Sequence, residues 1–270
     1  MLRIIKTEFM KIKRYHILLI GLIGMLCSPL LQLFSQMVVN EEYKRPNFDF
    51  AALAEMTVWG SAQVFMPALF TLIGGYLISR EYSDDTLKNI LTVPVSFRKF
   101  LAGKLVAIGL LAMLFGVYCF GVTAVVGVVV GLPDIKVSVL AIALLQMTGL
   151  AFWVYIVVAP IIVICSRRPG MFMSGSIMAF LAGYCILFFK SGLLRQIYPF
   201  SAALTMIGFD TSSYSGTSDK GSVLLAAVSL GSMLLIAVVL VCISKAPEDA
   251  HKKKKAKGRG RSSRRGQQQR

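Results

Sequence analysis

The chain has 270 residues, of which 56% are hydrophobic, and its mean hydropathy of +0.70 excludes an ordinary water-soluble domain. It carries 29 Lys and Arg residues against 13 Asp and Glu residues, a formal net charge of +16 at pH 7. This composition predicts an all-α integral membrane protein whose charged side chains lie in loops and at helix ends.

The N-terminal residues 1–15 place apolar side chains, such as Ile5 and Phe9, among lysines and arginines. The pattern is typical of an amphipathic helix lying in the inner membrane interface, with a plain basic flank as the alternative. The apolar run that follows is longer than the hydrophobic region of a signal peptide and has no small-x-small cleavage site after it. We therefore interpret it as a retained membrane anchor.

Six apolar runs are each near the 20 or so residues that cross the hydrocarbon core of a bilayer. None contains an internal charged residue, each of which would cost about 2.5–3.5 kcal/mol at the centre of a span. The predicted spans are residues 17–39, 57–79, 105–132, 137–165, 171–189 and 223–243. Most basic residues then fall on the side of the N-terminus, so the positive-inside rule predicts that both termini are cytoplasmic. Residues 1–244 are expected to form one six-span domain.

Short connections join most of the spans. Residues 40–56 are predicted to form an outer loop, residues 131–134 (Gly-Leu-Pro-Asp) a tight outer turn, and residues 166–170 a tight inner turn. Gly175, Ala179 and Gly183 recur at four-residue spacing in the fifth span, as Gly127 and Gly131 do in the third. Both patterns predict close approach of helix backbones.

Residues 190–222 are largely apolar at first, but Lys190, Arg195, Pro199 and Asp210 prevent a clean span. We predict a short helix or re-entrant region between the fifth and sixth spans, at the outer surface; a loosely packed outer loop is the alternative.

Residues 245–270 form a basic tail with too few apolar side chains to fold, and we expect it to be disordered in the cytoplasm. Its basic residues suit contact with anionic lipid headgroups, or act only as an orientation signal. No aromatic residues interleave the charges, so nucleic acid is not expected as a partner.

The most informative segment is residues 80–104, here named the coupling segment, which holds 3 of the 13 acids. Ser83 is predicted to cap a short helix with Asp84 and Asp85 in its first turn, where the helix dipole favours acids. The apolar stripe of that helix consists of Leu87, Ile90 and Leu91, and Pro94 ends it.

Ser96 is predicted to cap a second helix, which carries Arg98, Lys99 and Lys104 into the third span. A short helix held between two membrane helices moves with them. We therefore interpret the coupling segment as a cytoplasmic docking site for a soluble partner, with a structured inner loop as the alternative.

The coupling segment resembles the first cytoplasmic loop of ABC-2 type permeases, the membrane subunits of ABC exporters. The matching residues are Glu81, Thr86, Leu87, Leu91, Pro94, Ser96, Arg98, Lys99 and Lys104, whereas Asp85 replaces the usual glycine before Thr86. The layout of residues 1–244 is similar to permeases that protect bacteria against lantibiotics and bacitracin. The resemblance implies a bacterial plasma membrane, a second permease as homo- or heterodimer partner, and separate ATPase subunits that bind ATP and Mg²⁺.

Catalytic groups are scarce in this sequence. There is no Gly-x-x-x-x-Gly-Lys-Ser/Thr phosphate loop, and the two histidines, His16 and His251, are far apart. The five cysteines show no spacing typical of a metal site. No catalytic residue, metal site or cofactor is therefore expected on this chain, and the energy for transport must come from a partner.

The resemblance implies an exporter, and a path of neutral side chains predicts an amphiphilic substrate, such as a peptide antibiotic or a lipid-like compound. The candidate substrate path contains the neutral polar residues Gln63, Thr71, Gln146, Thr148 and Tyr155, for which hydrogen bonding between helices is the alternative role. A membrane sensor or scaffold that recruits its partner through the same segment is the alternative function, and a membrane enzyme is disfavoured by the missing catalytic groups.

Overall fold

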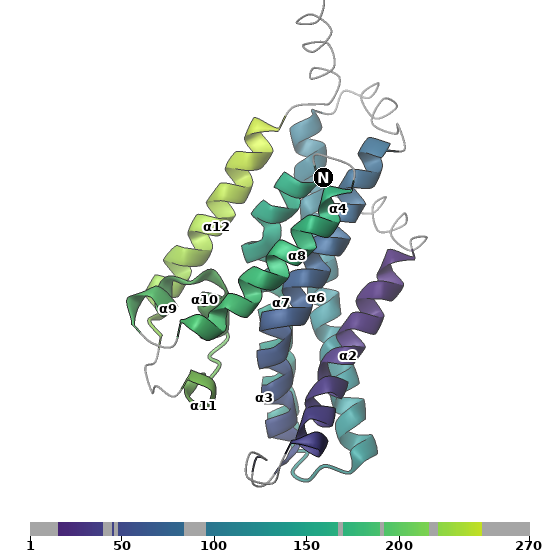
Figure 1. Ribbon diagram of the computed structural model, residues 1–270, viewed down its shortest axis with the longest axis vertical. Helices are drawn as coiled ribbons and strands as arrows, with labels where there is room; N and C mark the ends of the chain where they lie inside the picture. The colour runs from purple at the N-terminus through teal and green to yellow at the C-terminus, as the bar shows by residue number, and fades with distance from the viewer. Residues whose placement is uncertain are drawn as a thin grey trace, which may run out of the picture.

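The computed structural model describes residues 16–39, 45, 48–83, 96–166, 170–189, 192–215 and 221–244 (Figure 1). Within these ranges the chain is helical and has no strands, and six helices are long and apolar enough to cross a membrane. The predicted all-α, six-span membrane fold is thus confirmed. The predicted N-terminal helix (residues 1–15) and the basic tail (residues 245–270) lie outside the described residues.

The six spans are formed by the following elements: α2 (Ile17–Val38), α3 (Phe50–Gly60) with η2 (Ser61–Phe65) and α4 (Met66–Ser83), α6 (Phe97–Val130), α7 (Val137–Cys165), α8 (Met171–Tyr184) with η3 (Cys185–Phe188), and α12 (Val223–Ile243). Between the fifth and sixth spans, the described residues form three short helices: α9 (Leu193–Ile197), α10 (Pro199–Met206) and α11 (Ser212–Ser215).

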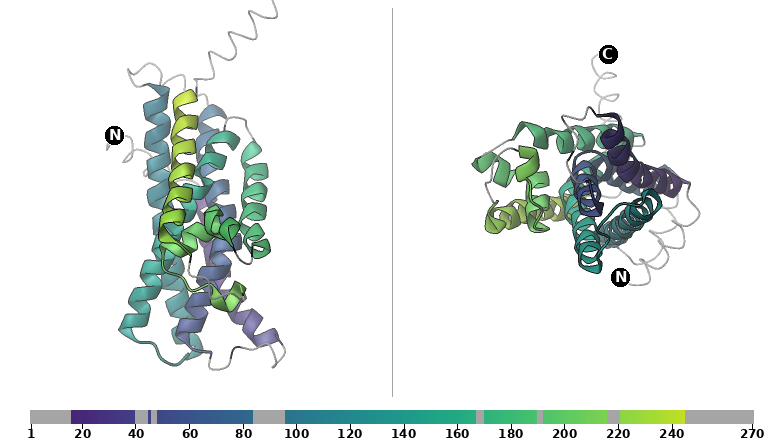
Figure 2. Two further views of the ribbon diagram at one scale, coloured as in Figure 1. Left: turned by 90° about the vertical axis from the view of Figure 1, so that its left-hand side faces the viewer. Right: turned by 90° about the horizontal axis from the view of Figure 1, so that it is seen from below.

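The bundle is built around α7 and the continuous helix α3–η2–α4, whose apolar windows are the most buried of the six spans. Helix α6 packs along α7, α8 packs on α4, and α12 packs on α7. The end-on view of Figure 2 shows α8, α9, α10 and α12 on one side of the bundle and α2 on the other. Helices α9 and α10 turn back onto the bundle without crossing it (Figure 1), so their re-entrant position in a membrane stays a prediction.

The second span begins earlier than its hydropathy indicates, so the prediction that residues 40–56 are all loop is wrong. Helix α3 starts at Phe50 because the carboxylate of Asp49 accepts a hydrogen bond from the N–H of Ala52 (2.8 Å) and caps the helix. Phe50 and Leu53 are fully buried, which explains why this polar-flanked segment folds onto the bundle.

A π-helix interrupts the second span at Ser61–Phe65, next to Pro67. Proline has no N–H, so Pro67 cannot bond the carbonyl of Gln63 one turn earlier, and its ring crowds that oxygen. The chain widens instead, and the N–H of Met66 bonds the carbonyl of Ser61, five residues back.

The small-residue stripe of the fifth span is confirmed as a packing surface. Gly175, Ala179 and Gly183 are buried, and a methyl group added at Gly183 would lie 2.2 Å from the carbonyl oxygen of Gln63. In the third span, Gly127 lies against Phe50, whereas Gly131 has open space around it. Gly131 instead adopts a left-handed conformation (φ 72°) that ends α6 in the predicted tight turn.

Candidate functional site

The coupling segment contains the end of α4 and the start of α6, which lie at the same end of the bundle (Figure 1). Glu81 and Ser83 lie in the last turn of α4, and their side chains are not described. The predicted contact residues Asp84, Asp85, Thr86, Leu87, Ile90, Leu91 and Pro94 lie outside the described residues. The docking role of the segment therefore stays a prediction.

The basic residues in the last part of the coupling segment differ in exposure. Ser96 occupies the N-cap position of α6, without a side-chain hydrogen bond, and Arg98 and Lys99 are exposed in the first turn. Lys104 is only 2% exposed, and its ammonium lies 5.5 Å from the centre of the Phe100 ring. Arg98 and Lys99 are thus accessible to a partner, whereas Lys104 is built into the packing of the bundle.

The α4 side of the coupling segment is tied to α8. The guanidinium of Arg80 donates a hydrogen bond to the hydroxyl of Tyr76 (2.9 Å), and the Tyr76 ring meets Phe172 edge-on at 5.6 Å. Gly75 lets Phe172 approach closely, because a methyl group there would lie 2.7 Å from the Cβ of Phe172. These contacts join the end of α4 to the start of α8.

The α6 side is tied to α7. The hydroxyl of Tyr155 donates a hydrogen bond to the carbonyl of Leu105 (2.6 Å), and its ring lies over Gly109. Tyr155, a candidate for the substrate path, therefore joins two helices, which is the alternative role predicted for it.

The other path candidates occupy two separate helix contacts. Gln63 and Thr71 are buried in the second span, where Thr71 lies near Gly175 of α8. Thr148 and Gln146 both belong to α7. The backbone of Thr148 lies against Gly116 of α6, and Gln146 is half-buried. The Nε2 of Gln63 and the hydroxyls of Thr71 and Thr148 have no hydrogen-bond partner among the described residues. These groups are polar and unsatisfied, but the described structure does not gather them around one cavity.

A buried polar contact that the sequence did not single out joins α2, η2 and α6. The hydroxyls of Ser28 and Ser61 are 2.7 Å apart, and the Ser61 hydroxyl lies 4.0 Å from the thiol of Cys119. Small polar residues inside apolar spans were the only signal for it. None of the five cysteines forms a disulfide, and no group of three metal-ligating side chains occurs among the described residues.

At the opposite end from the coupling segment, aromatic and charged side chains form a cluster that we name the outer aromatic cluster: Arg45, Glu55, Trp59, Phe209 and Tyr214. Arg45 binds Glu55 through both guanidinium nitrogens (3.1 and 3.2 Å) and lies 5.0 Å from the centre of the Tyr214 ring. Tyr214 stacks on Trp59 at 4.5 Å, and Trp59 stacks on Phe209 at 6.2 Å. Burial, with the nearby carboxylate of Glu55, raises the pKa of Tyr214 well above its ordinary value, so its hydroxyl stays protonated.

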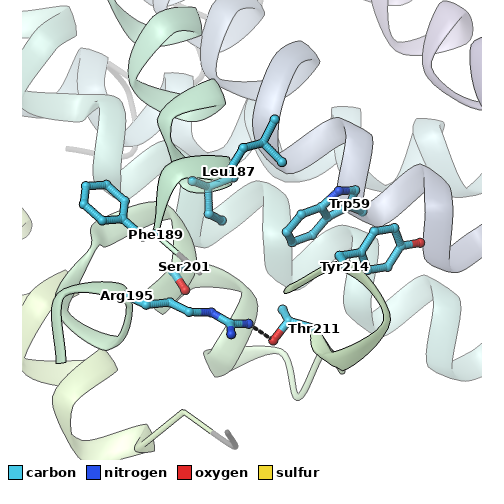
Figure 3. A pocket seen from close by; sticks show the side chains of 8 residues that line it. Trp59, Leu187, Phe189, Arg195, Ser201, Thr211 and Tyr214 are labelled. Atoms are coloured by element: carbon cyan, nitrogen blue, oxygen red, sulfur yellow. Dashed lines mark hydrogen bonds between the residues drawn. The ribbon is translucent and has the colours of Figure 1, made fainter. Parts of the chain in front are cut away.

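A cavity of about 30 Å³ lies beside this cluster, between α3, η3 and the short helices (Figure 3). Its walls include Trp59 and Tyr214, and Arg195 reaches past Ser201 to donate a hydrogen bond to the hydroxyl of Thr211. Arg195 is only 7% exposed. In the sequence it was only a residue that interrupts a span, since nothing there places it beside residues of α3.

The cavity and the coupling segment are about one bilayer apart. Trp59 and Arg80 belong to one continuous helix, and their 21-residue separation spans about 30 Å, the thickness of a hydrocarbon core. Trp and Tyr are enriched at membrane interfaces, so the outer aromatic cluster has the composition expected of that position.

Comparison with known proteins gives one family and one distant relative. Residues 4–186 of the chain match the family described as "ABC-2 family transporter protein". A bacitracin transport permease protein, BCRB of Bacillus licheniformis, is 31% identical over 94 residues, which cover 35% of this chain and 45% of that protein. The matched region thus spans less than half the length of the relative. No solved structure matches the chain significantly.

Proposed function

This chain belongs to the ABC-2 family of transporter proteins, and from that premise we propose that it is the permease subunit of an ATP-driven exporter. As a multi-pass membrane protein of a transporter family, it forms the membrane-embedded part. The proposal adds cytoplasmic ATPase subunits that bind ATP and Mg²⁺, and a second permease, identical or homologous, in a bacterial plasma membrane. We further propose that both termini lie in the cytoplasm, which the distribution of basic residues supports.

The observation that carries the proposal is the pair of links on either side of the coupling segment. On one side, Tyr76 of α4 contacts Phe172 of α8; on the other, Tyr155 of α7 bonds the carbonyl of Leu105 in α6. A partner that pushes on the segment between α4 and α6 would move two helix pairs, α4 with α8 and α6 with α7. This is how work done by a separate ATPase would reach the membrane.

The proposed contact with the ATPase combines the apolar stripe of Leu87, Ile90 and Leu91 with exposed charge. Arg98 and Lys99 are accessible at the start of α6 and suit acidic residues on the partner. Lys104 is assigned a packing role instead, because it is almost fully buried.

The proposed substrate is amphiphilic, such as a peptide antibiotic or a lipid-like compound, moved out of the cell or the membrane. The BCRB relative is named as a bacitracin transport permease, which is consistent with a peptide antibiotic. Within the described spans, the unsatisfied groups of Gln63, Thr71 and Thr148 are neutral, which suits such a molecule better than a bare ion.

The test is copurification of the tagged chain from membranes in mild detergent, with identification of every bound subunit. We expect a Walker-motif ATPase, and we expect Leu87→Asp to abolish its recovery and transport while the permease still reaches the membrane. The matched control is Ile135→Asp, which places the same charge in the turn at the opposite end and should retain the ATPase.

If Leu87→Asp retains both the ATPase and transport, the docking role is wrong. If the wild-type chain instead recovers a kinase or a cell-wall enzyme and no ATPase, the chain is the scaffold or sensor considered as the alternative function.

A further inference from the structure

The cavity beside the outer aromatic cluster has the chemistry of an oxyanion site. Arg195 lies in it at only 7% exposure, together with the hydroxyls of Ser201 and Thr211 (Figure 3). Holding a guanidinium away from water is costly, and the cost is offset where hydrogen bonds or an anion satisfy it. The planar donor fork of arginine matches the oxygens of a phosphate group especially well.

The short helix that carries Arg195 is fixed on two sides. The hydroxyl of Tyr198 donates to the carbonyl of Ala182 on α8, and the hydroxyl of Ser229 on α12 donates to the carbonyl of Ile197 (2.6 Å). Burial raises the pKa of Tyr198 to about 12, so this phenol remains a donor at neutral pH. The guanidinium is therefore held in place before any ligand arrives, which reduces the entropic cost of binding.

The wall of the cavity is partly apolar. Ile186, Leu187 and Phe189 line it, and Leu187 is 37% exposed. The cavity volume of about 30 Å³ admits one or two oxygens of a phosphate group, with the rest of the group at its mouth. A free anion would make no use of the apolar surround, whereas a lipid-like molecule would cover it.

We propose that this cavity binds the phosphate group of a lipid-like amphiphile, with Arg195 as its ligand and the apolar chain along Leu187 and Phe189. The position about one hydrocarbon thickness from Arg80 places it where lipid phosphates lie. The inference goes beyond the proposed transport function and does not require it, because it concerns binding to the permease alone.

Trp59 lines the cavity and reports on its contents. In the full chain carrying Trp153→Phe, Trp59 is the remaining tryptophan, and its fluorescence is followed in neutral maltoside detergent. The probes are dioctanoyl phosphatidic acid, the matched dioctanoylglycerol without phosphate, and inorganic phosphate. We expect a saturable change with the phosphatidic acid and none with the other two at the same concentrations.

Arg195→Gln should weaken phosphatidic acid binding by about tenfold or more, because it removes a charged hydrogen-bond donor to the phosphate. Arg195→Lys should lie between the two, and the control Lys136→Gln, at an exposed basic residue outside the cavity, should bind as the parent does. Equal binding by Arg195→Gln, or an equal response to dioctanoylglycerol, would overturn the proposal.

An equal response to inorganic phosphate would replace the amphiphile with a free-anion site and so also overturn it. If Arg195→Gln does not fold, the three-probe comparison on the parent remains decisive, and Thr211→Val must weaken binding several-fold. Because no ATPase is present, failure here leaves the transport proposal standing, and failure of ATPase copurification leaves this one standing.

Discussion

Replacing Gly183 by alanine is the sharpest test of how the fifth span packs on the π-helix. The added methyl group would lie 2.2 Å from the carbonyl oxygen of Gln63 and 2.9 Å from the Cγ of Pro67. The first of these is a backbone atom, so it cannot move aside as the tip of a long side chain would. The oxygen and the methyl must separate by about 1 Å to reach ordinary van der Waals contact, which forces α8 away from η2.

The expected magnitude follows from two opposing effects. Overpacking of this kind costs about 1–3 kcal/mol, and here the upper end applies because the displacement also stretches the hydrogen bond from Ser176 to the carbonyl of Ala68 (2.8 Å). Replacing a helical glycine by alanine returns about 1 kcal/mol of helix propensity. The net loss is about 2 kcal/mol, which for a chain of this size lowers the unfolding temperature by about 4–8 °C.

The assay is thermal unfolding in detergent, followed by far-UV circular dichroism at a single heating rate, since unfolding of such a protein is often irreversible. The matched control is Gly121→Ala in α6, where an added methyl group has no neighbour within 4 Å. That variant should unfold at or above the wild-type temperature. If Gly183→Ala is as stable as Gly121→Ala, the close contact between α8 and Gln63 does not exist as described.

Two further substitutions test individual contacts. Tyr155→Phe should destabilise the protein by about 0.5–1.5 kcal/mol through loss of its hydrogen bond to α6. Tyr118→Phe should not, because the hydroxyl of Tyr118 has no hydrogen bond among the described residues. Equal effects of the two substitutions would contradict the link. A double-mutant cycle on Arg45 and Glu55 should give a coupling below about 1 kcal/mol that falls with added salt, because these side chains are 28% and 33% exposed. A larger, salt-insensitive coupling would show that the pair is shielded from solvent.

The spans could be predicted because a charged side chain inside the hydrocarbon core costs several kcal/mol, and this cost depends only on the residues of the span itself. The fourth and sixth spans run as predicted, Val137–Cys165 and Val223–Ile243, since each is apolar throughout and is bounded by polar or charged residues. The turn after α6 was equally readable, because the glycine that ends the helix and the proline that follows it both act within a few residues.

The start of the second span was missed for a reason that no local pattern contains. Glu55 interrupts the apolar run before Thr57, so hydropathy assigns this stretch to a loop. In the structure Glu55 is paired with Arg45 from the preceding loop, while Leu53 and Phe50 on the same helix are buried. Glu55 is compatible with this helix because its side chain is partly exposed and meets Arg45, and the helix packs on the bundle because Phe50 and Leu53 are buried. These contacts involve residues outside the stretch, so local hydropathy does not contain them.

The candidate sites also combine features that the local sequence predicts with features that depend on residues far away in the chain. Exposure of Arg98 and Lys99 agrees with their position at a span edge, but the burial of Lys104 depends on how Phe100 and the neighbouring helices surround it. The cavity at the other end joins Trp59 to Arg195 and Thr211, which are more than a hundred residues later in the chain. Pairing over such distances leaves no periodicity in the sequence.

The continuous helix α3–η2–α4 connects both candidate sites, and its irregular centre explains why. A regular helix through Pro67 would leave the carbonyl of Gln63 without a donor and in contact with the proline ring. The π-helix removes that conflict. Gly183, which has no side chain, allows α8 to pack directly against the carbonyl of Gln63. A π-helical turn interrupts the regular ladder of backbone hydrogen bonds, so the helix bends most easily there. In this chain that turn lies between the outer aromatic cluster and the coupling segment. Changes at Gly183 should therefore alter the two ends together, whereas changes at Gly121 should alter neither.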